Sequence, residues 1–290
     1  GRRGSVPFVA VLEDGTRIRA RVAGVDRRAA DAVVRIYRLT RLRNVGDEHP
    51  FTSLRRTVER EALVALQARD VGVRTPRLRA VAPVGDAYVL AYEAVDGPTL
   101  DRAAPERLTP EVLRALWAEV ATMHRHRIAH RDLRTSNVRL DREGRQWVVG
   151  LEFAEIAASD SLRRADVAQL LTSLALAAGP EAAVDSAVDQ LGPATVAASL
   201  ALLQPAALSG PTQAEVRSRP GLLDEVRACV EQRSGVEPPE LEPVTRITGR
   251  QLVTALMLVA VVYGLAPRAA DLPAIVAQVR DADWRWIGPL

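Results

Sequence analysis

Short apolar runs with turn residues between them fill the first ninety positions of the chain. Val6–Leu12 is the first run, and Asp14-Gly15 after it is typical of a hairpin turn. Basic and apolar residues alternate from Arg17 to Val22, which predicts a strand with one buried face. Further strands are predicted at Ala32–Tyr37 and, as a pair around Gly85-Asp86, within Val81–Ala91. The first part of the chain is therefore expected to be rich in sheet.

One helix is expected among these strands. Between Thr52 and Arg69 the apolar residues recur every three or four positions, which is the period of an amphipathic helix. The face predicted to be buried comprises Leu54, Val58, Ala62, Leu63 and Leu66.

Helical patterns dominate after Gly97. Thr109-Pro110-Glu111 combines a capping residue, a first-turn proline and an acidic residue, as helix starts commonly do. Its predicted buried stripe is Leu113, Leu116, Trp117, Val120 and Met123. A hairpin is expected where Val138–Leu140 and Trp147–Val149 flank the turn Asp141–Gly144. Further helices are predicted at about 165–178, 181–191, 193–203 and 220–232.

The last fifty residues have a different pattern. Three prolines in Val236–Pro243 predict an extended linker. Gln251–Pro267 is then almost uninterruptedly apolar and would span about 26 Å as a helix. With arginines on both sides, this run predicts a transmembrane helix, and a buried core helix is the alternative. Trp284 and Trp286 suit a membrane interface.

Composition narrows the possible functions. Apolar residues make up 48% of the chain and aromatic residues 4%, so the core is expected to consist of Leu, Val and Ala. All 39 basic residues are arginine, so no lysine amine is available for chemistry. A net charge of +3 without a basic-aromatic stripe does not indicate nucleic-acid binding. The single Cys229 excludes an intrachain disulfide, and the non-methionine start indicates a piece of a longer protein.

One short segment carries the strongest chemical signal. His130-Arg131-Asp132-Leu133-Arg134-Thr135-Ser136-Asn137 matches the H-R-D-L-x-x-x-N pattern of the protein-kinase catalytic loop at every fixed position. In that loop Asp132 would accept a proton from the attacking hydroxyl, and Asn137 would hold magnesium. Arg134 would lie near the transferred phosphate. The pattern predicts a two-lobed kinase-like fold.

The residue expected to complete the metal site is different. A kinase places an aspartate of the sequence Asp-Phe-Gly about thirteen residues after the loop asparagine, whereas this chain has Gly150-Leu151-Glu152. Glycine has no oxygen ligand in its side chain, so phosphoryl transfer would lose one metal anchor. Glu152 is the possible substitute. Only sixteen residues separate Gly150 from Asp166, so an active version would phosphorylate a small molecule, sugar or lipid rather than a protein.

The nucleotide-binding residues are altered in the same way. Arg35 takes the position of the lysine on the third strand, with Glu61 as its predicted partner, although a solvated arginine and a surface glutamate are the alternative. Backbone groups of Glu93 and Val95, in the segment that joins the lobes, would meet an adenine edge. No G-x-G-x-x-G covers the phosphates, since Gly15 and Gly24 are isolated.

With these motifs, the chain resembles the amino-terminal portion of actinobacterial flippase-like proteins, the lysylphosphatidylglycerol-synthase transmembrane-region family. The resemblance implies a kinase-like domain, similar to aminoglycoside or lipopolysaccharide phosphotransferases, ahead of a polytopic membrane bundle. It rests on the loop at 130–137, the arginine-flanked run at 251–267, and shorter segments at 51–53 with the Glu61 helix, 153–155, 166–171, 205–210 and 220–225.

The expected architecture is an α+β, bilobal, kinase-like (aminoglycoside-phosphotransferase-like) fold followed by a linker and a transmembrane helix. Its predicted segments are a first lobe at 1–92, a helical lobe at 93–235, a linker at 236–246, a first transmembrane helix at 247–268, and an interfacial segment with the start of a second span at 269–290.

The predicted function is that of a pseudokinase-like domain at the plasma membrane, with residues 1–246 on the cytoplasmic side. It would regulate lipid or envelope-substrate handling by its own downstream membrane domain. ATP and Mg²⁺ are the possible cofactors, and the lipid bilayer and a nucleotide are the expected partners, with no nucleic acid. The alternatives are an active atypical kinase for a small molecule, sugar or lipid, and an anchor domain that binds no nucleotide.

Overall fold

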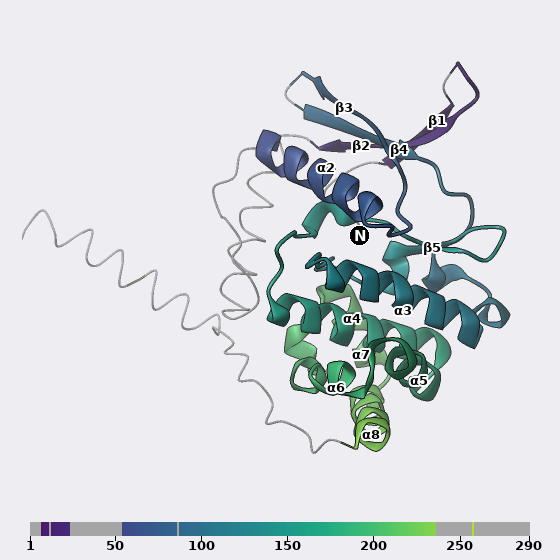
Figure 1. Cartoon of the computed structure of the whole chain (residues 1–290), viewed down its shortest axis with the longest axis vertical. Helices are drawn as coiled ribbons and strands as arrows, with labels where there is room; N and C mark the ends of the chain where they lie inside the picture. The colour runs from purple at the N-terminus through teal and green to yellow at the C-terminus, as the bar shows by residue number, and fades with distance from the viewer. Residues whose placement is uncertain (1–6, 12, 24–53, 86, 236–256, 258–290) are drawn as a thin grey trace, which may run out of the picture. The chain divides into compact units, whose positions relative to one another are not determined.

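A computed structural model describes residues 7–11, 13–23, 54–85, 87–235 and Met257 (Figure 1). The chain divides into two compact units, residues 1–245 and 246–290. The first unit contains the elements described below. The domain boundaries expected within and beyond it stay predictions.

Among the described residues of the first unit, four antiparallel strands form the larger of two sheets, in the order β1-β2-β4-β3. Ile18 and Ala20 of β2 are buried with Ala91 of β4, as the alternating pattern predicted. The arginines of β2 share the opposite face with Tyr92, which pairs with Arg19. Ala32–Tyr37, the further predicted strand, lies outside the described residues. The strands are β1 (Pro7–Val11), β2 (Arg17–Ala23), β3 (Leu78–Val84) and β4 (Ala87–Glu93).

Helix α2 (Leu54–Asp70) matches the predicted helix in position but buries a different face. Val58 is buried as expected, whereas Leu63 and Leu66 are 52% and 54% exposed. The prediction of the buried face was wrong because it followed apolar residues only. Glu61 is 3% exposed, and its polar partners, described below, turn the helix so that a carboxylate lies inside. The rest of the buried face is Val64, Ala65 and Ala68.

Helix α3 (Pro110–Arg125) begins at the predicted cap, where Thr109 accepts a hydrogen bond from the Val112 amide. Its buried stripe contains the five predicted residues and His124. Helix α4 (Asp160–Ala178) begins five residues before the predicted start. Ser159 caps it by accepting from the Leu162 amide, so the local Ser-x-x-Leu signal outweighs the polar composition of the first turn.

The remaining helices follow the prediction in part. The helix predicted at 193–203 ends at Ala197 and continues as a 3-10 turn at Leu200–Leu202. Helix α7 was not predicted, since its sequence has few apolar residues at helical spacing. The elements are α5 (Pro180–Leu191), α6 (Pro193–Ala197), α7 (Gly210–Ser218) and α8 (Leu222–Ser234).

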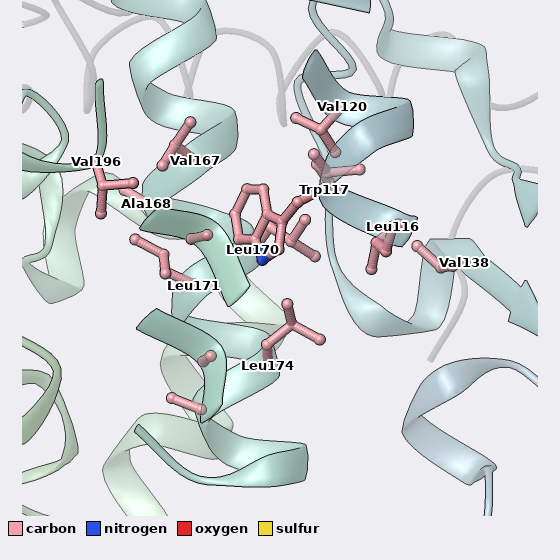
Figure 2. Close-up of a cluster of buried hydrophobic side chains, with 14 of the residues drawn as sticks. Leu116, Trp117, Val120, Val138, Val167, Ala168, Leu170, Leu171, Leu174 and Val196 are labelled. Carbon is pink, nitrogen blue, oxygen red and sulfur yellow. The ribbon is translucent and has the colours of Figure 1, made fainter. Parts of the chain in front are cut away.

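The main core joins these helices around Trp117 (Figure 2). Trp117 of α3 is fully buried in a cluster that includes residues of α4 and of strand β5 (Val138–Leu140). Leu170, Leu171 and Leu174 of α4 belong to the same cluster (Figure 2). Leucine, valine and alanine supply most of this core, as the composition indicated. Such burial is the dominant stabilising contribution to a fold.

A short hairpin, β5 (Val138–Leu140) with β6 (Gln146–Val148), follows the loop at 130–137 as predicted. Asp141 closes its turn by accepting from the amides of Glu143 and Arg145 and from the Trp147 indole. The hairpin packs against Gly97, where a β-carbon would lie 2.0 Å from the Leu140 carbonyl oxygen. Only glycine fits this approach.

Among the described residues, no helix has both the length and the apolar character needed to span a bilayer. The predicted span at 247–268 lies outside them, apart from Met257. The linker at 236–246 and the segment at 269–290 lie outside them too.

Candidate functional site

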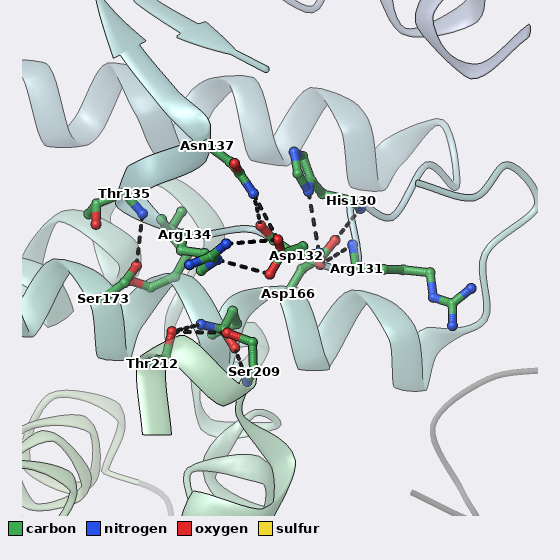
Figure 3. Close-up of polar contacts among 12 residues, drawn as sticks. His130, Arg131, Asp132, Arg134, Thr135, Asn137, Asp166, Ser173, Ser209 and Thr212 are labelled. Atoms are coloured by element: carbon green, nitrogen blue, oxygen red, sulfur yellow. Dashed lines mark hydrogen bonds and ion pairs between the residues drawn. The ribbon is translucent and has the colours of Figure 1, made fainter. Parts of the chain in front are cut away.

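The loop at 130–137 is fastened to α4 through Asp166 (Figure 3). The Asp166 carboxylate is 1% exposed and accepts the amides of His130 at 2.6 Å and Arg131 at 2.7 Å. Arg131 has φ 65°, a left-handed conformation that is costly outside glycine. The two hydrogen bonds from backbone amides to the buried Asp166 carboxylate hold the loop in this conformation.

Asp132 is enclosed by two neighbours in the loop (Figure 3). Arg134 donates Nε to its Oδ1 at 2.9 Å and Nη2 to its Oδ2 at 3.1 Å. Asn137 donates Nδ2 to the Asp132 carbonyl at 2.7 Å and to Oδ2 at 3.0 Å. The carboxylate predicted to be a base is thus neutralised by a forked ion pair. The structure brings the three predicted loop residues together.

Gly150 lies directly beside Asn137. A β-carbon on residue 150 would be 3.1 Å from Asn137 Oδ1. Two backbone contacts set this position: Val149 donates its amide to the Asn137 carbonyl at 2.9 Å, and its own carbonyl lies 2.9 Å from His130 Nε2. Residue 150 therefore occupies the position from which a side chain would meet the loop asparagine.

Glu152, the predicted substitute metal ligand, lies in the 3-10 turn Leu151–Phe153. Burial raises the pKa of the Tyr92 hydroxyl to about 12. The positive charge of Arg21 lowers this pKa, and the negative charge of Glu152 raises it. This places the Glu152 carboxylate within electrostatic range of Tyr92. Glu152 makes no hydrogen bond to Asn137 in the described part of the chain.

The described residues around Asn137 do not fit a magnesium ion. Magnesium sites usually include one or two free carboxylates, whereas Asp132 is paired with Arg134 and residue 150 has no side-chain oxygen. Within the ranges that the structure describes, no three His, Cys, Asp or Glu side chains gather closely enough for a metal. Asn137 Oδ1 alone faces residue 150 as a candidate ligand.

Glu61 has two partners that the sequence did not indicate. Arg21 of β2 donates Nη2 to Glu61 Oε2, and the Tyr92 hydroxyl donates to Oε1 at 2.9 Å. Both carboxylate oxygens are thereby satisfied inside the protein. The predicted partner Arg35 lies outside the described residues, so its pairing with Glu61 stays a prediction.

The segment that follows β4 uses its backbone groups within the protein. The Val95 carbonyl accepts Arg139 Nε at 3.1 Å, and the Gly97 carbonyl accepts Nη2 of the same arginine. The Glu93 amide donates to the Arg77 carbonyl at 2.9 Å. Glu93 and Val95 were predicted to meet an adenine edge, and that role stays a prediction. Arg139 was missed because these two contacts join residues more than forty positions apart in the sequence.

Glu155 also joins two elements, a role that no sequence pattern indicated. Its Oε2 accepts from Arg60 of α2 and from Arg131 of the loop, both at 3.0 Å. Its backbone pairs with Ala129 in both directions, at 2.8 and 2.9 Å. The carboxylate thus lies between α2 and the loop at 130–137.

Comparison with known proteins gives similarity to solved structures. No family model matches the chain, and no curated protein matches it either. Among solved structures it is similar to a crystal structure of an aminoglycoside-3'-phosphotransferase of type VIII. That similarity has a TM-score of 0.46 and 17% sequence identity, and it covers 78% of this chain and 90% of the other. Membership of the flippase-like family stays a prediction.

Proposed function

We propose that this chain is a kinase-like domain that does not transfer phosphate and acts by binding and conformational coupling. The observation that carries the proposal is Gly150 beside Asn137, where a β-carbon would be 3.1 Å from Asn137 Oδ1. Phosphoryl transfer relies on metal ions that bridge the phosphates. A chain that keeps the loop asparagine but has glycine opposite it lacks the carboxylate that would complete the metal site.

The loop supports both the kinase-like ancestry of the domain and its lack of phosphate transfer. The eight-residue pattern and the bonds that Asn137 donates to Asp132 favour kinase ancestry. The forked pair between Arg134 and Asp132 opposes activity, because a base must be available to the hydroxyl that it deprotonates. Both sets of hydrogen bonds join Asp132 to residues two and five positions further along the chain.

We also propose a membrane role. Residues 1–246 would lie on the cytoplasmic side of the plasma membrane and regulate a downstream membrane domain that handles lipid or another envelope substrate. The apolar run at 251–267 with its flanking arginines supports this, as does the resemblance to the flippase-like family. Protease treatment of sealed inside-out vesicles should digest this part of the chain, and protection from the protease would contradict the orientation.

One observation favours a second candidate, an active kinase for a small molecule, sugar or lipid. Asn137 Nδ2 donates to Asp132 Oδ2 at 3.0 Å, and Glu152 is only two residues from Gly150. Activity would require the Glu152 carboxylate to serve as a metal ligand together with Asn137.

Magnesium-dependent ATP turnover by the purified full chain tests the choice. The proposal expects the same background rate for the wild type and for Asp132→Ala, since no transfer depends on that carboxylate. A rate that Asp132→Ala abolishes would refute the proposal and favour the active kinase. In that case Glu152→Gln distinguishes the metal ligand, because a variant with full activity would exclude Glu152.

A further inference from the structure

Helix α2 exposes apolar side chains on the side opposite its buried face. Leu63 and Leu66 lie one helical turn apart, and each is about half exposed. In the described part of the chain, helices α3 to α8 expose no large apolar side chain to this extent. Exposed apolar side chains that lie together on a surface mark a contact with another molecule. The outer side of α2 is therefore a candidate interaction surface.

Charged residues lie on both sides of this apolar centre. Five residues spaced alternately by four and three positions form one line along the helix, and they are Arg55, Glu59, Ala62, Leu66 and Arg69. The alanine is half-buried and the other four residues are exposed. An apolar centre between charged ends is the layout of a surface that pairs with another helix.

The line of residues is complementary to itself. In an antiparallel pair whose two-fold axis passes level with Val64, position 59 of one helix is level with position 69 of the other. Glu59 then faces Arg69, and Leu66 faces the small side chain of Ala62. In a parallel pair each residue would face its own copy, so like charges would oppose each other. The charges therefore favour a second copy of the chain in the antiparallel direction.

The contacts within the chain leave both charged groups able to take part. Arg55 donates Nε to Glu59 Oε1 at 2.6 Å, and Arg69 donates Nη1 to the Thr75 carbonyl at 3.0 Å. Among the described residues, Glu59 Oε2 and Arg69 Nη2 make no hydrogen bond. An anionic lipid surface is a poorer partner, because the exposed acids Glu59 and Asp70 would repel it.

We propose that α2 is the contact through which two copies of this chain pair in the antiparallel direction. Leu66 of each copy packs on Ala62 of the other, and Glu59 pairs with Arg69 at both ends. The same residues serve both copies, as a two-fold contact requires. One helix pair is a small interface compared with the roughly 1,200–2,000 Å² of stable complexes, so pairing should be reversible.

Sedimentation velocity of the full chain in mild detergent tests the proposal. The wild type should show a monomer–dimer equilibrium that shifts with concentration. Leu66→Asp should raise the dissociation constant at least about tenfold, because it places a charge in the apolar centre. Val84→Asp is the matched control. Val84 is 59% exposed on β3, so its replacement should leave the dimer unchanged.

Exchange of the two charges tests the direction of the pair and leaves Leu66 in place. Glu59→Arg and Arg69→Glu should each weaken the dimer at least about threefold, because like charges then oppose each other at both ends. The double variant should return to within about twofold of the wild type, since the exchanged charges again pair across the two-fold axis. This recovery does not depend on whether Leu66→Asp folds.

The proposal fails if the wild type is monomeric throughout the concentration range. A loss of binding to anionic vesicles in Leu66→Asp would then favour a lipid surface as the partner. It also fails if Leu66→Asp dimerises like the wild type, which would assign the association to another part of the chain. A double variant as weak as the single variants would overturn the antiparallel pair. None of these outcomes depends on whether the chain transfers phosphate.

Discussion

At the scale of single residues, two glycines matter for different reasons. Gly150 leaves out a carboxylate next to Asn137, which bears on chemistry, whereas Gly97 lets the chain pass close to Leu140, which bears on stability. Both have positive φ values, 83° and 125°. A left-handed conformation alone costs a non-glycine residue about 1–2 kcal/mol, so the neighbours decide the difference between them.

Gly97→Ala should destabilise the protein strongly. Its β-carbon would lie 2.0 Å from the Leu140 carbonyl oxygen, so the backbone must move as well as accept strain. We expect a loss of about 4 kcal/mol or more in the free energy of unfolding. Chemical denaturation of Gly72→Ala is the matched control, because that glycine has φ 92° with nothing within 4 Å. Equal losses in the two variants would contradict the close approach.

The Tyr92 hydroxyl should lose its proton at a higher pH than an ordinary tyrosine. Its pKa rises to about 12 because burial disfavours the phenolate, with Arg21 opposing and Glu152 reinforcing the shift. A raised pKa means that the neutral form stabilises the fold below the ordinary value of about 10 and that this contribution is lost as pH rises towards 12. The difference in absorbance at 295 nm between wild type and Tyr92→Phe measures it. A midpoint near pH 10 would show that Tyr92 is not buried against Glu61.

The sequence predicted single residues well where the signal was local. Thr109 and the stripe through Trp117 determine α3 without help from the rest of the chain, because caps and helical periodicity are properties of neighbouring residues. The position of Arg134 near the site was predicted from the sequence, but its ion pair with Asp132 was not. The burial of Glu61 could not be predicted, because it depends on Arg21, forty positions away.

The hairpin of β5 and β6 shows how one side chain defines an element. Desolvation opposes ionisation of Asp141, but hydrogen bonds from the Trp147 indole and from Arg145 prevail and lower its pKa. Its three-residue strands make few ladder bonds of their own. The closed turn therefore depends on an ionised carboxylate.

Acid should open this turn. A lowered pKa stabilises the fold above the ordinary aspartate value of about 3.9, and this contribution is lost as pH falls through the folded value. The Trp147 indole N–H resonance should keep its hydrogen-bonded chemical shift at pH 5, and it should still keep it at a pH just below the ordinary aspartate pKa. Asp141→Asn should change this chemical shift already at neutral pH. An unchanged resonance in that variant would contradict the assigned contact.

Elements were predicted less well where composition was ambiguous. Helix α4 could have been extended to Asp160 from the Ser159 cap, a signal that was present in the sequence. Helix α7 had no such signal, since Thr212 and Gln213 are buried through polar contacts with Gln169 and the Leu208 carbonyl. Helical periodicity of apolar residues does not detect an element that is held by polar contacts.

Within the described residues of the first unit, buried apolar side chains are unevenly distributed. The sheet has a small cluster of its own, Ile18, Ala20 and Ala91, whereas the helices share one large core around Trp117. Helix α2 belongs to the large core through Val64, Ala65 and Ala68. Stability within the unit is therefore expected to follow buried apolar contacts.

Hydrogen exchange should resolve this difference. Amides of β2 and β4 should exchange at least tenfold faster than those of α3 and α4, because fewer apolar contacts oppose local opening of the sheet. Mass spectrometry of the native full chain would measure both sets in one experiment. Equal protection would mean that the sheet opens only together with the helical core.

The central claim is that Gly150 removes a metal anchor from an otherwise kinase-like loop. Gly150→Asp supplies the carboxylate: aspartate tolerates a left-handed backbone, and the Asn137 amide needs to move by only a few tenths of an ångström. Electron paramagnetic resonance of Mn²⁺, with ATP and the full chain, counts bound metal directly. We predict no Mn²⁺ binding beyond that of ATP for the wild type, and one bound ion for Gly150→Asp that a second change, Asn137→Ala, removes. One Mn²⁺ bound per wild-type chain, and lost in Asn137→Ala, would contradict the claim.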